Sequence, residues 1–344
     1  MSPSSGDGAV HGDRFSMLFV MHVPDEVLAR LRDAFPMIPF SMAEPPARGA
    51  AETFITDLQP GLGALATATA IVGWEFRAES LAAAPHLRWL HAASAGVDHF
   101  DLPALAARGV TVTNSRGVHA PSIAEHVMGM MIALTRRFPR LIHAQTAREW
   151  RDWETHREVG ELQGETVLLV GMGEIGQEVA RRATAFGMPV HGVRRHPGKT
   201  QPKGISRVYP IDALDEALAD ADHVVLMLPD TAATRGLFDG ARIAKMKPGA
   251  VIYNVGRGTA IDTAALTAAL ATGRLGGAGL DVTDPEPLPI ESPLWAMDNV
   301  LITSHTAGAT PRYWARLEPL LADNIGRWLR GAPMRNQVDL KAGY

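Results

Sequence analysis

Three polar side chains, each placed just after a short apolar run, have the chemistry to act together on a small acid. Arg257 follows GAVIYNVG, Glu286 follows GLDVTDP, and His305 follows NVLITS. A guanidinium can hold a carboxylate and polarise the neighbouring carbonyl. An imidazole can give a proton to the carbonyl oxygen as hydride reaches carbon, and a carboxylate beside it favours the protonated ring and fixes its orientation. The set suits the reduction of a 2-oxo acid.

A glycine-rich loop indicates where the hydride would come from. Gly171, Gly173 and Gly176 have GxGxxG spacing, directly after the apolar run VLLV and at the start of an amphipathic helical pattern. The first glycine permits a tight turn, the second lets a pyrophosphate approach the backbone, and the third lets helix and strand pack closely. The N–H groups at the helix start favour the same anion. We therefore predict dinucleotide binding by this loop, with Glu174 and Ile175 included.

Two arginines stand where an acidic residue is expected. In NAD sites the strand after the glycine loop ends in a carboxylate that binds the adenosine ribose. Here the chain reads Val193, Arg194, Arg195 and His196, with no Asp or Glu nearby. Guanidinium groups can clamp a 2′-phosphate with charge-assisted bonds, whereas a carboxylate would repel it. The pattern favours NADP and leaves NAD possible; the alternative is that both arginines lie on a solvated loop.

The elements that must position these groups alternate between short apolar runs and longer Ala- and Leu-rich stretches, the pattern of parallel α/β units. A helix is predicted over 25–35. Strands are predicted within 16–23, 69–75, 87–93, 109–115, 165–171, 188–195, 223–229, 249–256, 275–282 and 299–305. Because ligands of parallel α/β sheets bind outside the carboxyl ends of the strands, the loop and the three polar side chains are expected to converge.

Two longer helices are predicted outside this alternation. One spans 121–150, with Pro121 in its first turn and a Met- and Leu-rich face that suits either a core or a partner subunit. The other spans 311–331 and is ended by Gly331. Residues 1–15 lack the pattern of a signal peptide and are expected to be a disordered lead-in.

Composition excludes several kinds of chemistry in the 344-residue chain. It has no cysteine, so disulfides, thiolate nucleophiles, Fe–S clusters and Cys-based zinc sites are ruled out. The formal net charge of -4 disfavours a nucleic-acid partner. No apolar run approaches the roughly 20 residues that span a bilayer. None of the 13 histidines has metal-ligand spacing. We expect a cytoplasmic protein that binds no metal, membrane or nucleic acid.

The order of the motifs ASAGVD, NSRGVHAPSIAEHV, GMGEIG, LPDTAAT, NVGRG, GLDVTDPEP and SHTAG resembles the D-isomer-specific 2-hydroxyacid dehydrogenases. The similarity covers nearly the whole chain from about Ser16. It implies that Arg257 binds the substrate carboxylate, that His305 is the acid/base, and that Glu286 is its partner. The arginine pair resembles the NADP-preferring, glyoxylate/hydroxypyruvate reductase-like branch. Ser304 stands where the family often has Pro, which implies only a change in loop stiffness.

The resemblance also assigns binding positions away from the three catalytic groups. The N–H groups of Ser94, Ala95 and Gly96 would bind the substrate carboxylate from the other domain, and Asn254 lies on the catalytic strand. Further positions near the cofactor are Leu228, Pro229, Thr234, Val255, Gly256, Asp281 and Gly308. Either Trp150 or Trp153 could reach a neighbouring subunit's pocket, although interface or core packing explains them equally well.

The architecture implied is two doubly wound parallel-sheet domains. A Rossmann cofactor domain, residues 118–308, is inserted into a flavodoxin-like substrate domain made of 16–117 and 309–344. A homodimer is expected. The reaction would be reversible reduction of a 2-oxo acid by NADPH to the D-2-hydroxy acid.

Three rival functions stay open on the same scaffold. Formate or phosphite oxidation is disfavoured, because related formate dehydrogenases carry Gln where this chain has Glu286. Phosphoglycerate oxidation is possible, although no regulatory extension follows the last helix. A nucleotide-sensing corepressor would keep the same Arg, Glu and His, so the sequence does not discriminate against it.

Overall fold

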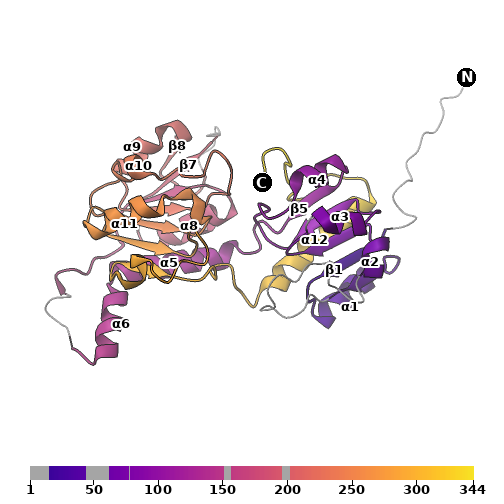
Figure 1. Cartoon of the computed structure of the whole chain (residues 1–344), viewed down its shortest axis with the longest axis horizontal. Coiled ribbons are helices and arrows are strands. Elements are labelled where there is room, and N and C mark those ends of the chain that lie inside the picture. The colour runs from indigo at the N-terminus through magenta and orange to yellow at the C-terminus, as the bar shows by residue number, and fades with distance from the viewer. Residues whose placement is uncertain (1–14, 44–61, 77, 151–155, 196–201) are drawn as a thin grey trace, which may run out of the picture. The chain divides into compact units, whose positions relative to one another are not determined.

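The computed structural model describes residues 15–43, 62–76, 78–150, 156–195 and 202–344. The chain forms two compact units (Figure 1). The first consists of Met1–Val118 together with Pro311–Tyr344, and the second is His119–Thr310. The two-domain α/β fold predicted from the sequence is confirmed by the two sheets described below.

The first unit is built on a parallel sheet in the order β2-β1-β3-β4-β5, the flavodoxin-like order. Helices cover both of its faces, and α12 returns from the far end of the chain to pack with α1 on one of them (Figure 1). The strands are β1 (Met17–Val20), β2 (Phe40–Met42), β3 (Ala70–Gly73), β4 (Trp89–Ala92) and β5 (Thr111–Asn114). The helices are α1 (Asp25–Ala34), α2 (Leu62–Thr67), α3 (Ala78–Ala83), α4 (Leu102–Ala107) and α12 (Tyr313–Leu329).

The second unit is built on a parallel sheet in the order β12-β11-β10-β9-β6-β7-β8, with a separate apolar cluster on each face. The strands are β6 (Val167–Val170), β7 (Val190–Arg194), β8 (Arg207–Pro210), β9 (His223–Leu226), β10 (Val251–Asn254), β11 (Gly277–Leu280) and β12 (Val300–Ile302). The helices are α5 (Ala120–Thr135), α6 (Phe138–Ala147), α8 (Glu174–Ala185), α9 (Leu214–Ala219), α10 (Gly240–Ile243) and α11 (Thr263–Ala271). The strand order reverses at β6, which is where dinucleotides bind such sheets.

The prediction of a single helix over 121–150 is wrong. The structure has α5 and α6 in its place, separated at Arg136 and Arg137. Arg137 has a left-handed backbone with φ of 58°. Pro139 follows in the first turn of α6; it has no N–H to donate to a continuous helix and disfavours a helical residue before it. As a result α6 projects away from the sheet of its unit (Figure 1).

Two edge strands were not predicted. β2 has three residues, and β8 ends in Pro210, which lacks the N–H of an interior strand residue. The predicted lead-in lies outside the described residues, except for Phe15. That side chain is 4% exposed and stacks on Trp89, so it belongs to the core of the first unit.

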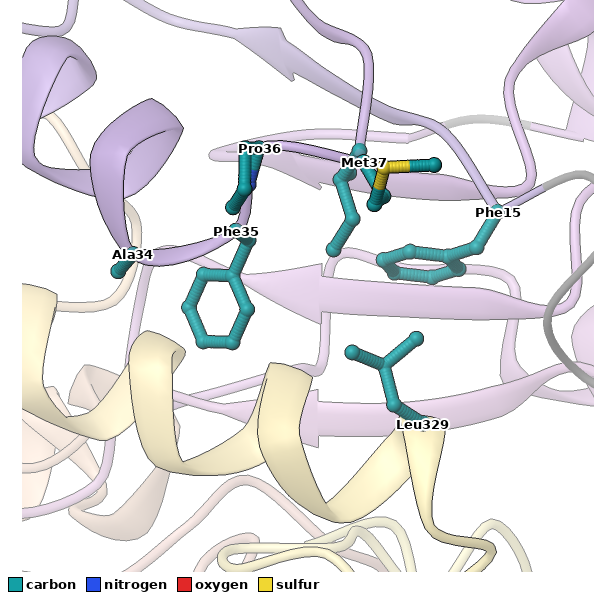
Figure 2. A pocket seen from close by; sticks show the side chains of 7 residues that line it. Phe15, Ala34, Phe35, Pro36, Met37 and Leu329 are labelled. Atoms are coloured by element: carbon teal, nitrogen blue, oxygen red, sulfur yellow. The ribbon is translucent and has the colours of Figure 1, made fainter.

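A shallow apolar hollow lies between the ends of α1 and α12 (Figure 2). Apolar side chains line it: Phe15, Ala34, Phe35, Pro36, Met37, Ile38 and Leu329. Phe15 precedes β1, so the hollow lies at the amino ends of the strands. It is therefore separate from the carboxyl-end loops where ligands of this fold bind. In the described part of the chain, no helix is long and apolar enough to cross a membrane.

A directed chain of buried hydrogen bonds joins β4 to the edge strand β5 in the first sheet. Trp89 Nε1 donates to Thr113 Oγ1 at 2.8 Å, and Ser115 Oγ donates to Ala92 O at 3.0 Å. His91 bridges them, with Nδ1 2.7 Å from Thr113 Oγ1 and Nε2 3.1 Å from Ser115 Oγ. Ser115 gives its one hydroxyl proton to Ala92 O, so Ser115 Oγ can only accept from His91 Nε2–H. The other ring nitrogen, Nδ1, then accepts from the Thr113 hydroxyl. Burial lowers the pKa of His91 to about 3, so the ring is neutral at pH 7.

We expect His91 to make the free energy of unfolding fall as the pH is lowered below 6.5. Unfolded His91 gains a proton as pH falls below 6.5, whereas the folded ring stays neutral until about pH 3. Its contribution is therefore complete above pH 6.5 and declines toward pH 3 by about 1.4 kcal/mol per pH unit. Urea unfolding at pH 7 and pH 5 measures this change. His91→Gln should show a smaller loss than the wild type, and equal losses would contradict the assignment.

Candidate active site

The glycine loop after β6 leaves open space at the start of α8. Gly171 has φ of 106°, and a Cβ on Gly176 would lie 2.5 Å from Gly171 O, so both positions require glycine. Gly173 is different, because a Cβ there would have no atom within 4 Å. Gly173 is also the N-cap of α8 and provides no side chain to cap the first turn. The loop therefore presents helix N–H groups to an open cradle, which fits a pyrophosphate.

The two arginines lie beside this cradle. Val193 pairs with Val170, and Gly171 N donates to Val193 O at 3.2 Å, so Arg194 ends β7 next to the first glycine of the loop. Arg194 is half-buried and Arg195 is exposed. The predicted contribution of His196 lies outside the described residues.

The loop after β9 is held by its own hydroxyl groups. Thr234 Oγ1 donates to Pro229 O at 2.6 Å and accepts from Thr231 N at 2.9 Å. Thr234 is 8% exposed, and Leu228 packs against one apolar cluster of the unit. Thr234 thus shapes this loop; contact of Leu228, Pro229 or Thr234 with a cofactor stays a prediction.

Asn254 at the end of β10 fixes the turn that carries Arg257. Its side chain is buried, donates from Nδ2 to Arg257 O at 2.9 Å, and accepts from Gly256 N at 3.1 Å. A Cβ on Gly258 would overlap Thr283 O, so this turn lies directly against the loop that follows β11. That contact places Arg257 near the segment that leads to Glu286. Val255 is buried beside the turn.

The carboxylate of Glu286 and the imidazole of His305 form a close pair. His305 Nδ1 lies 2.7 Å from Glu286 Oε1, and the side chains are 51% and 42% exposed. Because β10, β11 and β12 are neighbours in the sheet, Arg257, Glu286 and His305 follow three adjacent strand ends. The predicted catalytic set therefore shares one edge of the second sheet, and the His–Glu pair there is about half exposed.

Asp281 at the end of β11 holds the loop on which His305 lies. Its carboxylate accepts from Thr303 Oγ1 at 2.6 Å, from Thr306 N at 2.9 Å and from Ala307 N at 3.1 Å. His305 N donates to Asp281 O at 2.8 Å. Asp281 was predicted to lie near the cofactor; the structure gives it a structural role in this loop, and a cofactor contact stays a prediction.

Gly308 was also predicted to lie near the cofactor. It connects the end of the loop that carries His305 to the start of α5. Its carbonyl oxygen lies 2.9 Å from His119 Nδ1 and accepts from Ser122 Oγ at 3.3 Å. These contacts tie the first residue of the second unit to its last few residues.

In the first unit, the loop Ser94–Gly96 follows β4 with its carbonyl groups engaged. Ser115 N donates to Ser94 O, Asn114 Nδ2 donates to Ala95 O, and Ser94 Oγ donates to Gly96 O at 2.6 Å. Within the described part of the chain, the N–H groups of the three loop residues make no hydrogen bond. A row of N–H donors at a strand end can bind a carboxylate.

Comparison with known proteins decides the family. Residues 128–307 match the sequence profile of the D-isomer specific 2-hydroxyacid dehydrogenase NAD binding domain. Glyoxylate/hydroxypyruvate reductase B of Pectobacterium atrosepticum is 36% identical, over 80% of this chain and 87% of that protein. The chain belongs to the D-isomer specific 2-hydroxyacid dehydrogenase family. It is an NAD(P)-dependent oxidoreductase, similar to the glyoxylate/hydroxypyruvate reductases.

Solved structures of this dehydrogenase family share the whole fold. A family member from Aeromonas salmonicida has a TM-score of 0.80 at 32% identity, covering 95% of this chain and all of that one. A dehydrogenase from Xanthobacter autotrophicus Py2, solved with NADPH and MES, has a TM-score of 0.79 at 31% identity, covering 96% of this chain and all of that one.

The dehydrogenase also contains polar residues near this loop to which the sequence analysis gave no role. Thr303 and His126 lie within hydrogen-bonding distance of each other beside Asp281, and His119 contacts the end of the loop. In the sequence, His119 and His126 lie within the motif NSRGVHAPSIAEHV, and Thr303 directly precedes the motif SHTAG. Among the described residues, no group of three or more His, Asp or Glu side chains could hold a metal ion.

A matched pair of glycine variants tests the cofactor cradle of the dehydrogenase. Gly176→Ala forces a Cβ against backbone, so it should lower the free energy of unfolding by about 1–3 kcal/mol and also weaken cofactor binding. Gly173→Ala meets no protein atom, so its Tm should stay unchanged while its cofactor Kd rises. Thermal unfolding and cofactor titration distinguish the two. Unaltered cofactor affinity in Gly173→Ala would show that the pyrophosphate lies elsewhere.

Proposed function

We propose that the enzyme reduces a small 2-oxo acid, of the glyoxylate or hydroxypyruvate type, reversibly to the D-2-hydroxy acid with NADPH. The observation that carries the proposal is the His305–Glu286 pair at 2.7 Å, on the sheet edge that also presents Arg257. The similarity to glyoxylate/hydroxypyruvate reductase B supports the choice of substrate class.

His305 moves the proton in this proposal. The hydride that reaches carbon 2 of the acid would come from the nicotinamide cofactor when it is bound. Because Nδ1 of His305 faces the Glu286 carboxylate, that nitrogen keeps its proton. Nε2 is then the atom that donates a proton to the carbonyl oxygen and takes it back in the oxidation direction. Glu286 holds the ring in this orientation.

Two sets of donors hold the acid. The guanidinium of Arg257, placed by the Asn254 side chain, binds the carboxylate and polarises the carbonyl oxygen. The N–H groups of Ser94, Ala95 and Gly96, whose carbonyls are engaged within the first unit, are proposed as a second set of carboxylate donors. Hydrogen bonds hold both sets in place before the substrate binds. Binding therefore loses less conformational entropy in these loops.

The preference for NADP rests on Arg194 and Arg195. Arg194 ends the strand next to the glycine loop, where the acidic residue of an NAD site would stand. The Xanthobacter relative, 31% identical, was solved with NADPH.

A homodimer is proposed from the surface of α6. Phe138 is 44% exposed and Ile142 is 57% exposed on this helix, and Trp150 just beyond it is 93% exposed. Large apolar side chains exposed together are typical of an interface. The predicted alternative, Trp153, lies outside the described residues.

Replacing His305 tests the acid/base role. His305→Ala should lower kcat for glyoxylate and hydroxypyruvate by about 100- to 10,000-fold, with cofactor affinity nearly unchanged. Turnover is followed by NADPH absorbance on a panel that includes pyruvate and branched-chain 2-oxo acids. If His305→Ala kept wild-type turnover, the assignment would be wrong. If the wild type bound cofactor tightly but reduced none of these acids, a cofactor-sensing role would be favoured.

Replacing Arg194 tests the cofactor preference. Arg194→Asp removes a charge-assisted contact and adds repulsion, so it should raise the KM and Kd for NADPH by about 10- to 100-fold. The constants for NADH should change little, because NADH carries no 2′-phosphate. Arg207→Asp, on the exposed next strand, serves as a charge-matched control. Equal losses for both cofactors in Arg194→Asp would show that Arg194 does not bind the 2′-phosphate.

A further inference from the structure

His126 on α5 contacts the loop that carries His305. Its Nε2 atom lies 2.9 Å from Thr303 Oγ1 and 3.8 Å from Asp281 Oδ1. The side chain of His126 is 22% exposed and that of Asp281 is 2% exposed, so the cluster is largely withdrawn from water. The mechanism above uses neither His126 nor Thr303.

The direction of these hydrogen bonds follows from proton counting. Thr303 has one hydroxyl proton, and it is donated to Asp281 Oδ1 at 2.6 Å. The Thr303 oxygen can therefore only accept from the imidazole, so Nε2 of His126 carries a proton. The resulting order is His126 Nε2–H to Thr303 Oγ1, then Thr303 O–H to the Asp281 carboxylate. Each member sets the orientation of the next.

The loop needs such support because of its backbone. His305 has φ of 53°, in the left-handed region that is unfavourable for a residue with a Cβ. The residues that anchor this turn, Thr303 and Thr306, flank His305 closely and both bond to Asp281. The His305 side chain is half exposed, and within the described residues its ring bonds to Glu286. Its position is thus set mainly by the backbone of the loop.

We propose that His126 is a positioning residue for His305, acting through the Thr303 hydroxyl and the Asp281 carboxylate. This inference rests on the proposed acid/base role of His305. When His126 donates to Thr303, the threonine hydroxyl is kept turned toward Asp281, and the loop stays in the left-handed turn that presents His305 to Glu286. Loss of the donor frees the hydroxyl to rotate, and His305 then spends less time beside Glu286.

The first experiment compares His126→Leu, which cannot donate, with His126→Gln, whose amide N–H can replace Nε2–H. A displacement of a catalytic group by about 1 Å can cost about 100-fold in rate. We expect kcat to fall at least tenfold in His126→Leu and less in His126→Gln, with KM, the Kd for NADPH and Tm near wild type. His86→Gln, which alters an exposed histidine of the first unit, is the control and should leave kcat unchanged.

Thr303 provides an independent variant should His126→Leu fold poorly. Thr303→Val removes the hydroxyl at nearly constant shape and should reproduce the loss in kcat, whereas Thr303→Ser keeps the hydroxyl and should retain activity. A lower Tm with unchanged kcat in both His126→Leu and Thr303→Val would show a purely structural role and overturn the proposal.

The last comparison asks whether His126 acts through His305. In a His305→Ala background, adding His126→Leu should cause no further loss of residual turnover. A further loss as large as in the wild type would mean that His126 acts independently, and the proposal would fail. Retained turnover in His305→Ala itself would instead refute the acid/base role. The two failures are therefore distinguishable.

Discussion

Parallel pairing of every strand in the seven-stranded sheet is the constraint on which the active site depends. Because the strands run in one direction, their carboxyl ends meet at one edge, and the groups that follow β6, β10, β11 and β12 are brought to that edge. The arrangement requires helices on both faces, since parallel strands are buried on both sides. The separate apolar clusters on the two faces satisfy that requirement. The core and the site are consequences of the same topology.

Buried polar residues at the strand ends hold the following loops in one conformation through hydrogen bonds. Asn254 and Asp281 occupy equivalent places, at or just after the ends of neighbouring strands, and each bonds to the backbone of a loop that carries a proposed catalytic side chain. A buried carboxylate or amide is costly unless it is fully hydrogen-bonded. The loop donors meet this requirement, so the polar groups remain at a single geometry. Arg257 and His305 are in this way held by contacts that do not involve their own side chains.

Much of this organisation was predictable from the sequence. The apolar runs located most strands, and the GxGxxG spacing located the turn between β6 and α8. The resemblance named Arg257, Glu286 and His305, which follow three adjacent strands. The features that were missed are those with no periodic signal. β2 has too few residues to show alternation, and β8 ends in a proline. The break at Arg137 does have a signal in the sequence, Pro139, which the prediction of one continuous helix did not use. The link from His126 to Thr303 joins residues far apart in sequence, and only the folded chain brings them together.

The contact between His119 and the Gly308 carbonyl bears on how the chain is assembled from two parts. The second unit begins at His119 and ends at Thr310, and this hydrogen bond brings its entrance and exit together. When the two ends of an inserted segment lie close together, the surrounding domain is affected no more than by a short surface loop. This holds for an insert of any length. The five-stranded sheet can therefore recruit α12 from beyond the insertion with no distortion. The entry and exit of the second unit therefore occupy one place in the chain path, and the first unit's fold needs only a short connection there.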